Sequence, residues 1–487
     1  MKIIALLLTL LLLVPIIACA GENNKENNYI YTEPEITDEY VETEITDSLP
    51  DNLDFGGAAL SLLVRGEQPG SGTAYEFWAD EEDGDIINDS VYRRNRAVEE
   101  RLNLKLNVVP GPNWQDYARA LTMIRASVLA GDQAYTVIAG FSSPIATLSV
   151  EGILADIYGI PYIDLSKPWW NQRLTDELTI AGKLNFAAGD ANLSLIGSSY
   201  VIYVDEKLRQ DYEVPNLYDV VFDGKWTLDY MGNLVKDIYK DLNGDGKRDE
   251  GDQYGAVWAI YGETDAFIPS SNIRLTSNDE NGFPFLDMEY ERMSTLVNKV
   301  YSFYYENSGV LMSPRNDQGV IDLFQKGQTL LAPGYIGFSY WYYREVDDFG
   351  IIPYPKYDEN QDRYYTYIQG GMSLLCVPVN CDKTEMVGAF LEATASESYK
   401  NLTPSYFDMA MKIKFARDEI SAKMLDIVRD GINIGFANIY NDTIGSPFSV
   451  MRELMNAKNK DFASWFAKNE QKISLAIEKF VEQMTNQ

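Results

Sequence analysis

Residues 58–139 alternate between short apolar runs and stretches with helical periodicity, and this alternation constrains the fold more than any other feature. Apolar runs typical of buried strands occur at 58–64 and 135–139, and apolar residues alternate with polar ones at 104–108, which also predicts a strand. Apolar residues recur at helical spacing at 91–102 and again at 117–128. A strand–helix–strand–helix–strand order implies parallel strands joined by crossover helices. The sequence therefore predicts a doubly wound α/β sheet.

The rest of the chain predicts a second α/β region followed by helices. Strand-like runs at 200–204 and 329–332 are interspersed with helical patterns at 227–238 and 288–305. The last hundred residues read as mainly helical, with an apolar stripe from Phe462 to Met484. A length of 487 residues suits about three domain-equivalents or two large lobes.

The first twenty residues have the pattern of an export signal. Lys2 precedes an apolar stretch that is too short to span ~30 Å of hydrocarbon comfortably. The stretch ends in Ile-Ile-Ala-Cys at 16–19, which resembles a bacterial lipobox, in which the cysteine is acylated and becomes the new N-terminus. We interpret 1–18 as a lipoprotein signal peptide and Cys19 as the lipidation site. The alternative is an ordinary secretory signal in which Cys19 is incidental.

Acidic residues dominate 22–54, where Lys25 is the one base. A segment with so much like charge and few large apolar residues repels itself and stays extended. We therefore assign 19–54 to a lipidated acidic tether between the lipid and the folded body. No segment after the signal is apolar enough to cross a bilayer, so we expect the protein at the extracytoplasmic face of the cell membrane, held there by lipid.

The charge and the missing histidine exclude several function classes. The formal net charge is −32, so the surface repels phosphate backbones and anionic headgroups, which excludes nucleic acid as the main partner. The chain contains no histidine, which excludes Ser-His-Asp and Cys-His catalysis and His-ligated zinc.

Two cysteines follow Cys19. Cys376 and Cys381 are close enough in sequence for a disulfide in an oxidising space. Cys376 lies in a strand-like apolar run, however, which favours a reduced, buried thiol. The sequence leaves both possibilities open.

An acidic loop at 241–252 has the spacing of a calcium site. Oxygen-bearing side chains stand at loop positions 1, 3, 5, 9 and 12, and position 6 is a glycine. The predicted ligands are Asp241, Asn243, Asp245, Lys247 through its backbone carbonyl, Asp249 and Asp252. Position 12 is Asp252 where a bidentate Glu is usual, which resembles dockerin-type loops. We predict a structural Ca²⁺ here, the alternative being a polar turn.

Several blocks together resemble the extracellular solute-binding proteins of ABC importers, specifically the large carbohydrate-binding lipoproteins of Gram-positive bacteria. In family order, the blocks are 88–102 (NDSVYRRNRAVEERL), 164–171 (DLSKPWWN), 224–229 (GKWTLD), 323–327 (LFQKG) and 397–406 (ESYKNLTPSY). No single block is diagnostic. The resemblance rests on their order, combined with the lipobox, over about residues 55–487.

The resemblance implies a two-lobed, periplasmic-binding-protein-like fold of type II, with a hinge and a helical C-terminal region. Mapped onto this sequence, lobe 1 comprises 55–187 and 287–348, and lobe 2 comprises 188–286 and 349–487. The three crossings between lobes are expected near 184–190, 284–288 and 349–354. The implied function is that of a monomeric, non-enzymatic receptor that captures a carbohydrate, with an oligosaccharide favoured, and delivers it to the permease subunits of an ABC transporter.

Sugar sites use aromatic platforms edged by polar groups, so aromatic residues in predicted loops are the candidates. The predicted ligand contacts are Trp78, Trp170, Asn171, Trp258, Tyr261, Tyr335, Trp341 and Tyr440. The resemblance supports the loop with Trp170 and Asn171 and the one with Tyr335 and Trp341. The alternative for each aromatic residue is core packing, and one of Trp169 and Trp170 is expected in the core.

Two other functions remain open. A secreted glycoside hydrolase needs only two carboxylates at a suitable separation, which a sequence cannot measure, although no hydrolase motif is present. A calcium-stabilised adhesion or scaffold protein is the third possibility, and a deep cleft between two lobes would count against it.

Overall fold

The computed structural model describes residues 45–66, 76–412 and 419–486, and residues 46–487 form one compact unit. The predicted signal peptide, Cys19 and most of the tether lie outside the described residues. The end of the predicted tether packs on the fold, contrary to the prediction: Leu49 is buried, and Asp47 pairs with Arg101 at 2.7 Å. The tether therefore ends before 47, because these residues have partners that composition does not reveal.

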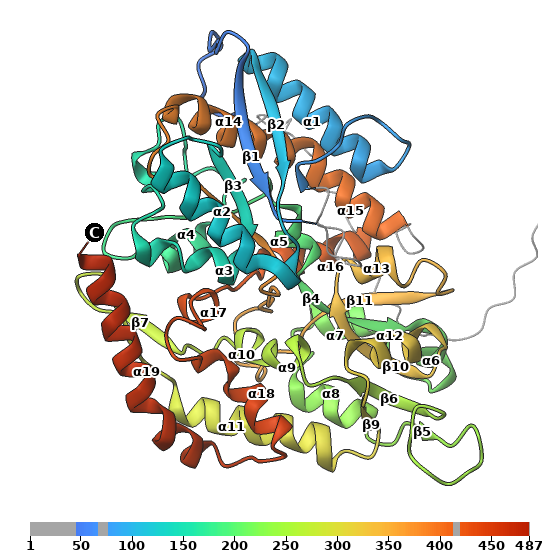
Figure 1. Ribbon diagram of the computed structural model, residues 1–487. Helices are drawn as coiled ribbons and strands as arrows, with labels where there is room; N and C mark the ends of the chain where they lie inside the picture. Colours follow the sequence, from blue (N-terminus) through green and yellow to red (C-terminus); the bar gives the residue numbers. More distant parts are fainter. Residues whose placement is uncertain (1–44, 67–75, 413–418, 487) are drawn as a thin grey trace, which may run out of the picture. The chain divides into compact units, whose positions relative to one another are not determined.

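The first sheet has the strand order β12-β3-β1-β2, and Figure 1 shows β3, β1 and β2 side by side. Its strands are β1 (Ala58–Val64), β2 (Leu104–Pro110), β3 (Val137–Phe141) and β12 (Ser373–Cys376). β1 runs parallel to β2 and β3, and helices α1 (Ile86–Leu102) and α2 (Tyr117–Ala130) connect these strands. This arrangement confirms the predicted α/β start of the fold. Cys376 and Cys381 are both free, and Cys376 is buried.

The second sheet has the order β11-β4-β10-β6-β5, with β9 paired to β6. Its strands are β4 (Tyr200–Asp205), β5 (Tyr239–Lys240), β6 (Gln253–Trp258), β9 (Val310–Met312), β10 (Thr329–Tyr335) and β11 (Phe349–Pro353). β4 is antiparallel to both β10 and β11, whereas β6 is parallel to β10 and β9. A separate hairpin joins β7 (Thr276–Asn278) and β8 (Pro284–Leu286).

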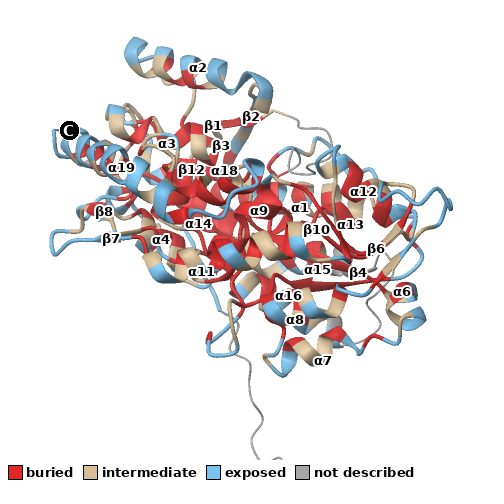
Figure 2. Ribbon diagram, turned by 90° about the horizontal axis from the view of Figure 1, so that it is seen from below, coloured by how far each residue is buried: buried red, intermediate tan, exposed pale blue. Residues whose placement is uncertain are grey.

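Helices cover both sheets. Those between β3 and β11 are α3 (Ser142–Ala146), α4 (Gln172–Leu178), α5 (Leu193–Gly197), α6 (Glu206–Asp211), α7 (Leu217–Phe222), α8 (Leu228–Val235), α9 (Gly262–Asp265), α10 (Phe267–Ser270), α11 (Tyr290–Tyr301), α12 (Asp317–Gln325) and α13 (Phe338–Trp341). Figure 2 shows the buried residues concentrated in the strands, while the outer faces of α2 and α6 are exposed. Among the described residues, no helix has both the length and the apolar character that a membrane span requires.

The predicted helical C-terminal region is confirmed. It comprises α14 (Thr384–Glu397), α15 (Thr403–Lys412), α16 (Glu419–Asp430), α17 (Phe436–Ile439), α18 (Val450–Asn456) and α19 (Phe462–Thr485). The buried face of α19 is the predicted apolar stripe, including Phe462, Ile473 and Met484.

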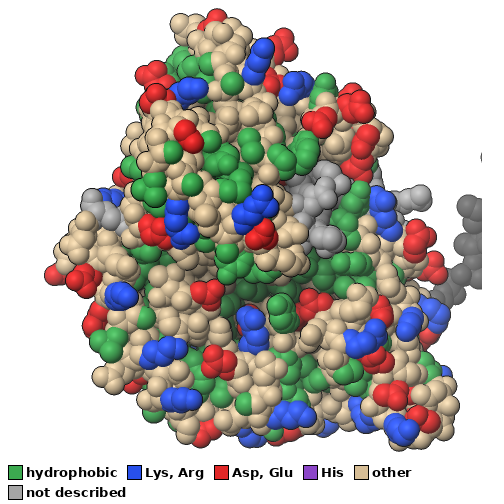
Figure 3. All heavy atoms as spheres, in the orientation of Figure 1, with side chains coloured by type: hydrophobic (Ala, Val, Ile, Leu, Met, Phe, Trp, Pro, Cys, Tyr) green, Lys and Arg blue, Asp and Glu red, His purple; other side chains and the backbone are tan. Residues whose placement is uncertain are grey.

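Figure 3 shows acidic and basic side chains spread over one face of the molecule, with hydrophobic side chains in its central hollow.

Strand pairing contradicts the predicted division into lobes. Segment 287–348 was assigned to lobe 1, but its strands β9 and β10 pair with β6 and β4 of the second sheet. Segment 349–487 was assigned to lobe 2, but its strand β12 pairs with β3, and α14 packs on α1. Local periodicity predicts a strand but not its distant partner, so these assignments had no support in the local sequence.

The chain crosses between the sheets at two places that the strand pairing defines. It leaves the first sheet between Ala187, which bridges to Leu375, and Tyr200 in β4, close to the crossing predicted near 184–190. It returns between β11 and β12. The crossings predicted near 284–288 and 349–354 are wrong, because β8 belongs to a hairpin and β11 lies inside the second sheet.

Candidate functional site

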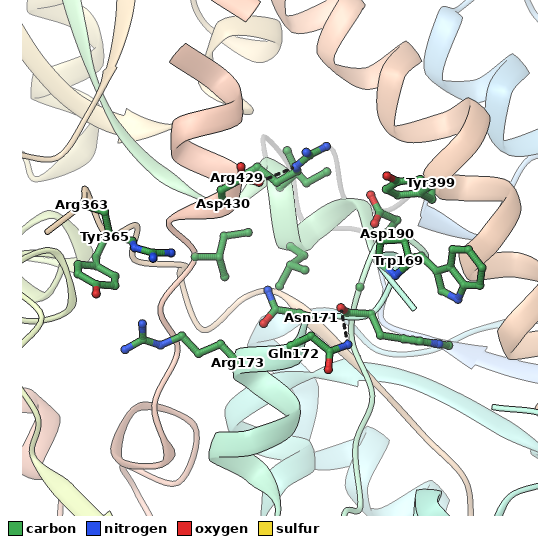
Figure 4. Close-up of a pocket in the computed structure, with 16 residues that line it drawn as sticks. Trp169, Asn171, Gln172, Arg173, Asp190, Arg363, Tyr365, Tyr399, Arg429 and Asp430 are labelled. Carbon is green, nitrogen blue, oxygen red and sulfur yellow. Dashed lines mark hydrogen bonds and ion pairs between the residues drawn. The ribbon is translucent and has the colours of Figure 1, made fainter. Parts of the chain in front are cut away.

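A cavity of about 410 Å³ lies where the two crossing segments meet (Figure 4). The side of the first sheet contributes residues 168–173 at the start of α4, and Tyr399 in the π-helical turn after α14. The side of the second sheet contributes Arg429 and Asp430 of α16, which packs on β11. The crossing segments supply Gly189 with Asp190, and Arg363 with Tyr365. Residues from both lobes and from the connections between them therefore share one cavity.

Two tryptophans form the buried floor of the cavity. The indole Nε1 atoms of Trp169 and Trp170 donate hydrogen bonds to the Glu392 carboxylate of α14, at 3.2 and 2.9 Å. The backbone N–H of Asp164 donates a third hydrogen bond to it at 3.2 Å. Both indoles and Glu392 are buried, and this burial raises the pKa of Glu392 to about 7. The indole rings are therefore fixed packing elements and not open stacking platforms.

The floor is joined to the first crossing by backbone contacts. Asn171 donates its N–H to the carbonyl oxygen of Ala188, and Asp190 donates its N–H to that of Trp169, both at 2.9 Å. Gly189 bridges to Trp170 between these two bonds. A Cβ at Gly189 would collide with the Trp169 carbonyl oxygen, so this close approach requires glycine.

Polar side chains edge the cavity. The Asn171 side chain accepts the N–H of Leu174 at 2.8 Å and so caps α4. Asp190 accepts the hydroxyl of Thr403 at 2.6 Å, and burial raises the pKa of Asp190 to about 6. Amides, carboxylates and a partly exposed tyrosine, Tyr399, suit a ligand rich in hydroxyl groups.

Three arginines also reach the cavity. The Arg173 guanidinium lies 5.0 Å from the centre of the Tyr365 ring and donates to Asn272 at 3.3 Å. In Figure 4, Arg173, Arg363 and Tyr365 lie on one side of the cavity, while Tyr399 and Asp190 lie on the opposite side. Arg429 lies 3.4 Å from the neighbouring Asp430 carboxylate.

The structure brings only two of the eight predicted ligand contacts, Trp170 and Asn171, to this cavity. Trp258 and Tyr440 are core residues, contrary to the prediction: Trp258 stacks on Phe267, and the Tyr440 hydroxyl lies 3.1 Å from that of Ser149.

The other predicted contacts lie outside the lining of this cavity. Tyr335 packs against Phe338 with ring centres 4.1 Å apart, and Trp341 belongs to the short helix α13. Trp78 and Tyr261 are exposed.

Sequence reasoning missed most of the polar lining. The missed residues are Gln172, Arg173, Asp190, Arg363, Tyr365, Tyr399, Arg429 and Asp430. One signal was present, because Tyr399 lies in the 397–406 block of the family resemblance. The arginines carried no local signal, since they lie in three segments that meet only in the folded chain.

The predicted calcium loop closes on its own backbone. The Asp241 carboxylate accepts the N–H groups of Gly244 at 2.6 Å and Gly246 at 3.0 Å. Asp252 is buried and accepts the Tyr239 hydroxyl at 3.0 Å and the Leu242 N–H at 3.2 Å. In the part of the chain that the structure describes, no three Asp, Glu or Cys side chains converge as a metal site. The calcium site therefore stays a prediction.

No family model and no curated protein matches the sequence. Solved structures do match. A sugar transporter from Rhizobium etli in an open conformation aligns with a TM-score of 0.55 at 15% identity, covering 88% of this chain and 99% of that one. A cyclo/maltodextrin-binding protein complexed with maltotetraose aligns with a TM-score of 0.52 at 15% identity, covering 88% and 96%.

The chain has the two-lobed periplasmic-binding-protein-like fold. An ABC transporter solute-binding protein from Thermotoga lettingae, bound with α-D-tagatose, shares this fold with a TM-score of 0.50 at 10% identity, over 88% of this chain and 100% of that one. The predicted fold class is thus confirmed. The cavity lies where the chain passes between the lobes.

Proposed function

We propose that this protein is a lipid-anchored extracytoplasmic receptor that captures a carbohydrate, with an oligosaccharide favoured, and delivers it to the membrane subunits of an ABC importer. One observation carries the proposal: a cavity with aromatic, amide and charged side chains is built from both lobes and both crossing segments. The similar solved structures are of sugar-binding and solute-binding proteins, which supports the same ligand class.

The position of the cavity suits a receptor that reports its own occupancy. A ligand shifts a two-state equilibrium only by its differential affinity for the two states. A carbohydrate that touches Tyr399 on one side and Arg429 on the other makes its full set of contacts in only one arrangement of the lobes. The importer then distinguishes loaded from empty receptor by the lobe arrangement.

Anchoring and the absence of catalysis belong to the same proposal. Acylation of Cys19 would hold the folded body at the outer face of the membrane by the acidic segment that follows. The protein acts as a monomer and releases its ligand unchanged. The rival function is that of a secreted glycoside hydrolase, which would release reducing sugar from an oligosaccharide.

Thermal unfolding with a panel of mono- and oligosaccharides tests the proposal. A ligand at 100 times its dissociation constant stabilises the folded state by about 2.7 kcal/mol, which gives a measurable rise in melting temperature. The variant Tyr399→Ala should lose most of this rise. The control Tyr158→Ala, an exposed tyrosine outside the cavity, should keep it.

Two results would contradict the proposal. Reducing sugar released during the incubation would identify a hydrolase. A melting temperature unchanged by every saccharide in the panel would refute carbohydrate capture.

A further inference from the structure

The charge balance of the cavity is opposite to that of the chain. The whole chain has 73 acidic and 41 basic residues, whereas the cavity lining has two acidic residues, Asp190 and Asp430, and three arginines. Arginine thus makes up 3 of 16 lining residues, in a protein where all Lys and Arg together make up 41 of 487. Because the net charge of −32 repels anions, a local cationic cluster is needed wherever an anion is to bind.

Arg173 is the cation of the cavity that lacks a carboxylate partner. Within the described ranges no Asp or Glu pairs with its guanidinium, which contacts only the Asn272 amide and the Tyr365 ring. A guanidinium carries five donors in a planar fork that matches a carboxylate, and Asn272 takes up one of its nitrogens. The remaining donors are available to a ligand.

Arg363 reinforces the charge of Arg173. Figure 4 shows its guanidinium on the same side of the cavity as Arg173 and Tyr365, so two like charges share that side. The partner of Arg363 is the neighbouring Asp362, at 3.3 Å, with 64% of the Arg363 side chain exposed. Such exposed pairs contribute at most about 1 kcal/mol, so a ligand carboxylate can compete for this arginine.

The opposite side of the cavity does not cancel this charge. Asp190, the half-buried acid there, already accepts a hydrogen bond from Thr403, and desolvation raises its pKa to about 6. Asp430 is exposed and lies beside Arg429. Arg429 therefore pairs with carboxylates, Asp426 and Asp430, whereas no carboxylate of the described residues forms an ion pair with Arg173.

We propose that the cavity takes a carbohydrate that bears carboxylate groups, such as a hexuronate oligosaccharide, with one carboxylate bound by Arg173 and Arg363 beside Tyr365. This inference rests on the proposed function and narrows its ligand class. The hydroxyl groups of the sugar face Asn171 and Asp190. Bidentate pairing with Arg173 selects the carboxylate over the hydroxymethyl group of a neutral sugar.

Matched pairs of oligosaccharides test this proposal by calorimetric titration. Each pair contains a di-, tri- or tetrasaccharide of galacturonate, glucuronate or mannuronate and its carboxyl-reduced counterpart, which differs only in a hydroxymethyl group. At least one acidic member should bind roughly 10- to 100-fold more tightly than its neutral counterpart, as charge-assisted hydrogen bonds imply. Raising the salt from 50 to 500 mM should weaken binding of the acidic member more than that of the neutral one.

Variants assign the effect to the arginine. Arg173→Gln should weaken binding of the acidic member by roughly 10- to 100-fold and that of the neutral member far less. Arg173→Lys, which keeps the charge but loses the planar fork, should give an intermediate loss. The control is Arg292→Gln, because Arg292 also lies over a tyrosine, Tyr357 at 4.9 Å, but outside the cavity. If Arg173→Gln lowers the melting temperature of the unliganded protein, Arg363→Gln at the exposed position replaces it.

The outcomes separate the two proposals. If neutral members bind at least as tightly as acidic members in every pair, the carboxylate proposal is refuted and carbohydrate capture stands. The carboxylate proposal is also refuted if the protein binds sulfated oligosaccharides but binds no uronate oligosaccharide. If no saccharide of either kind binds, both proposals fail. If the acidic members bind but Arg173→Gln and Arg363→Gln bind them as well as the parent does, the assignment to these arginines is wrong.

Discussion

Replacing Glu392 by glutamine should alter the pH dependence of stability, because burial raises the pKa of this carboxyl group. Glu392 is buried under the cavity and accepts three N–H groups, from Trp169, Trp170 and the backbone of Asp164. Burial raises its pKa from 4.5 to about 7. Glutamine has nearly the same shape but does not titrate in this range.

The magnitude follows from linkage. An acid whose pKa is higher in the folded state stabilises the fold fully below its unfolded pKa, and this stabilisation is lost as the pH rises through the folded pKa. A shift from 4.5 to about 7 corresponds to about 3 kcal/mol, lost between pH 4.5 and pH 7. The Glu392→Gln variant has no such loss. At pH 4.5 it should be less stable than the parent by about 1–3 kcal/mol, because the amide nitrogen faces an indole N–H and leaves a buried donor unpaired.

Urea unfolding of both proteins at pH 4.5, 6 and 7.5 measures the effect. The difference in unfolding free energy between parent and variant should shift by about 3 kcal/mol in favour of the variant as the pH rises. Other titrating groups, such as Asp190, affect both proteins alike and cancel. Glu397→Gln removes a partly exposed carboxylate from the same helix and controls for the charge of α14. A parent–variant difference that is constant with pH would refute the reasoning.

Two further predictions concern calcium and the anchor. At 100 times its dissociation constant, Ca²⁺ bound by the 241–252 loop stabilises the fold by about 2.7 kcal/mol. EGTA should therefore lower the melting temperature of the parent but not that of an Asp241→Ala, Asp245→Ala double variant. The control is Asp279→Ala, which alters another acidic turn and should respond to EGTA as the parent does. Equal effects of EGTA on all three would remove calcium from this loop. Cys19→Ser should move the protein from the membrane fraction of an expressing bacterium to the soluble fraction. The control Cys381→Ser should leave the protein in the membrane fraction. Retention of the Cys19→Ser variant on membranes would contradict acylation at Cys19.

The parts of the fold that follow from local pattern were predictable. β1, α1, β2, α2 and β3 appear in the predicted order, because each has its own local periodicity. The buried stripe of α19 and the buried thiol of Cys376 follow from local pattern too. The lobe assignment of β9, β10 and β12 did not follow, because antiparallel and parallel partners far away in sequence decide it.

The candidate site was less predictable for a related reason. Trp170 and Trp258 are both tryptophans next to apolar segments, and nothing local distinguishes a cavity floor from the middle of an aromatic core. Trp258 is surrounded by the rings of Phe267, Phe303 and Tyr354, which come from three different segments. The arginines of the cavity likewise come from positions 173, 363 and 429, and their convergence depends on the return of the chain from the second sheet to the first.

The floor of the cavity and the first crossing form a single hydrogen-bonded structure. The bonds from Asn171 to Ala188 and from Asp190 to Trp169 join the segment before α4 to the connection between the lobes. Glu392 fixes the two indoles of that segment to α14, so the floor cannot move independently of the first lobe. Rotation of the second lobe about this connection therefore changes the distance from the floor to Arg429 and Tyr365 on the other walls. A ligand that fills the cavity opposes that rotation through the contacts that bind it, and this is the differential affinity that a receptor of this kind requires.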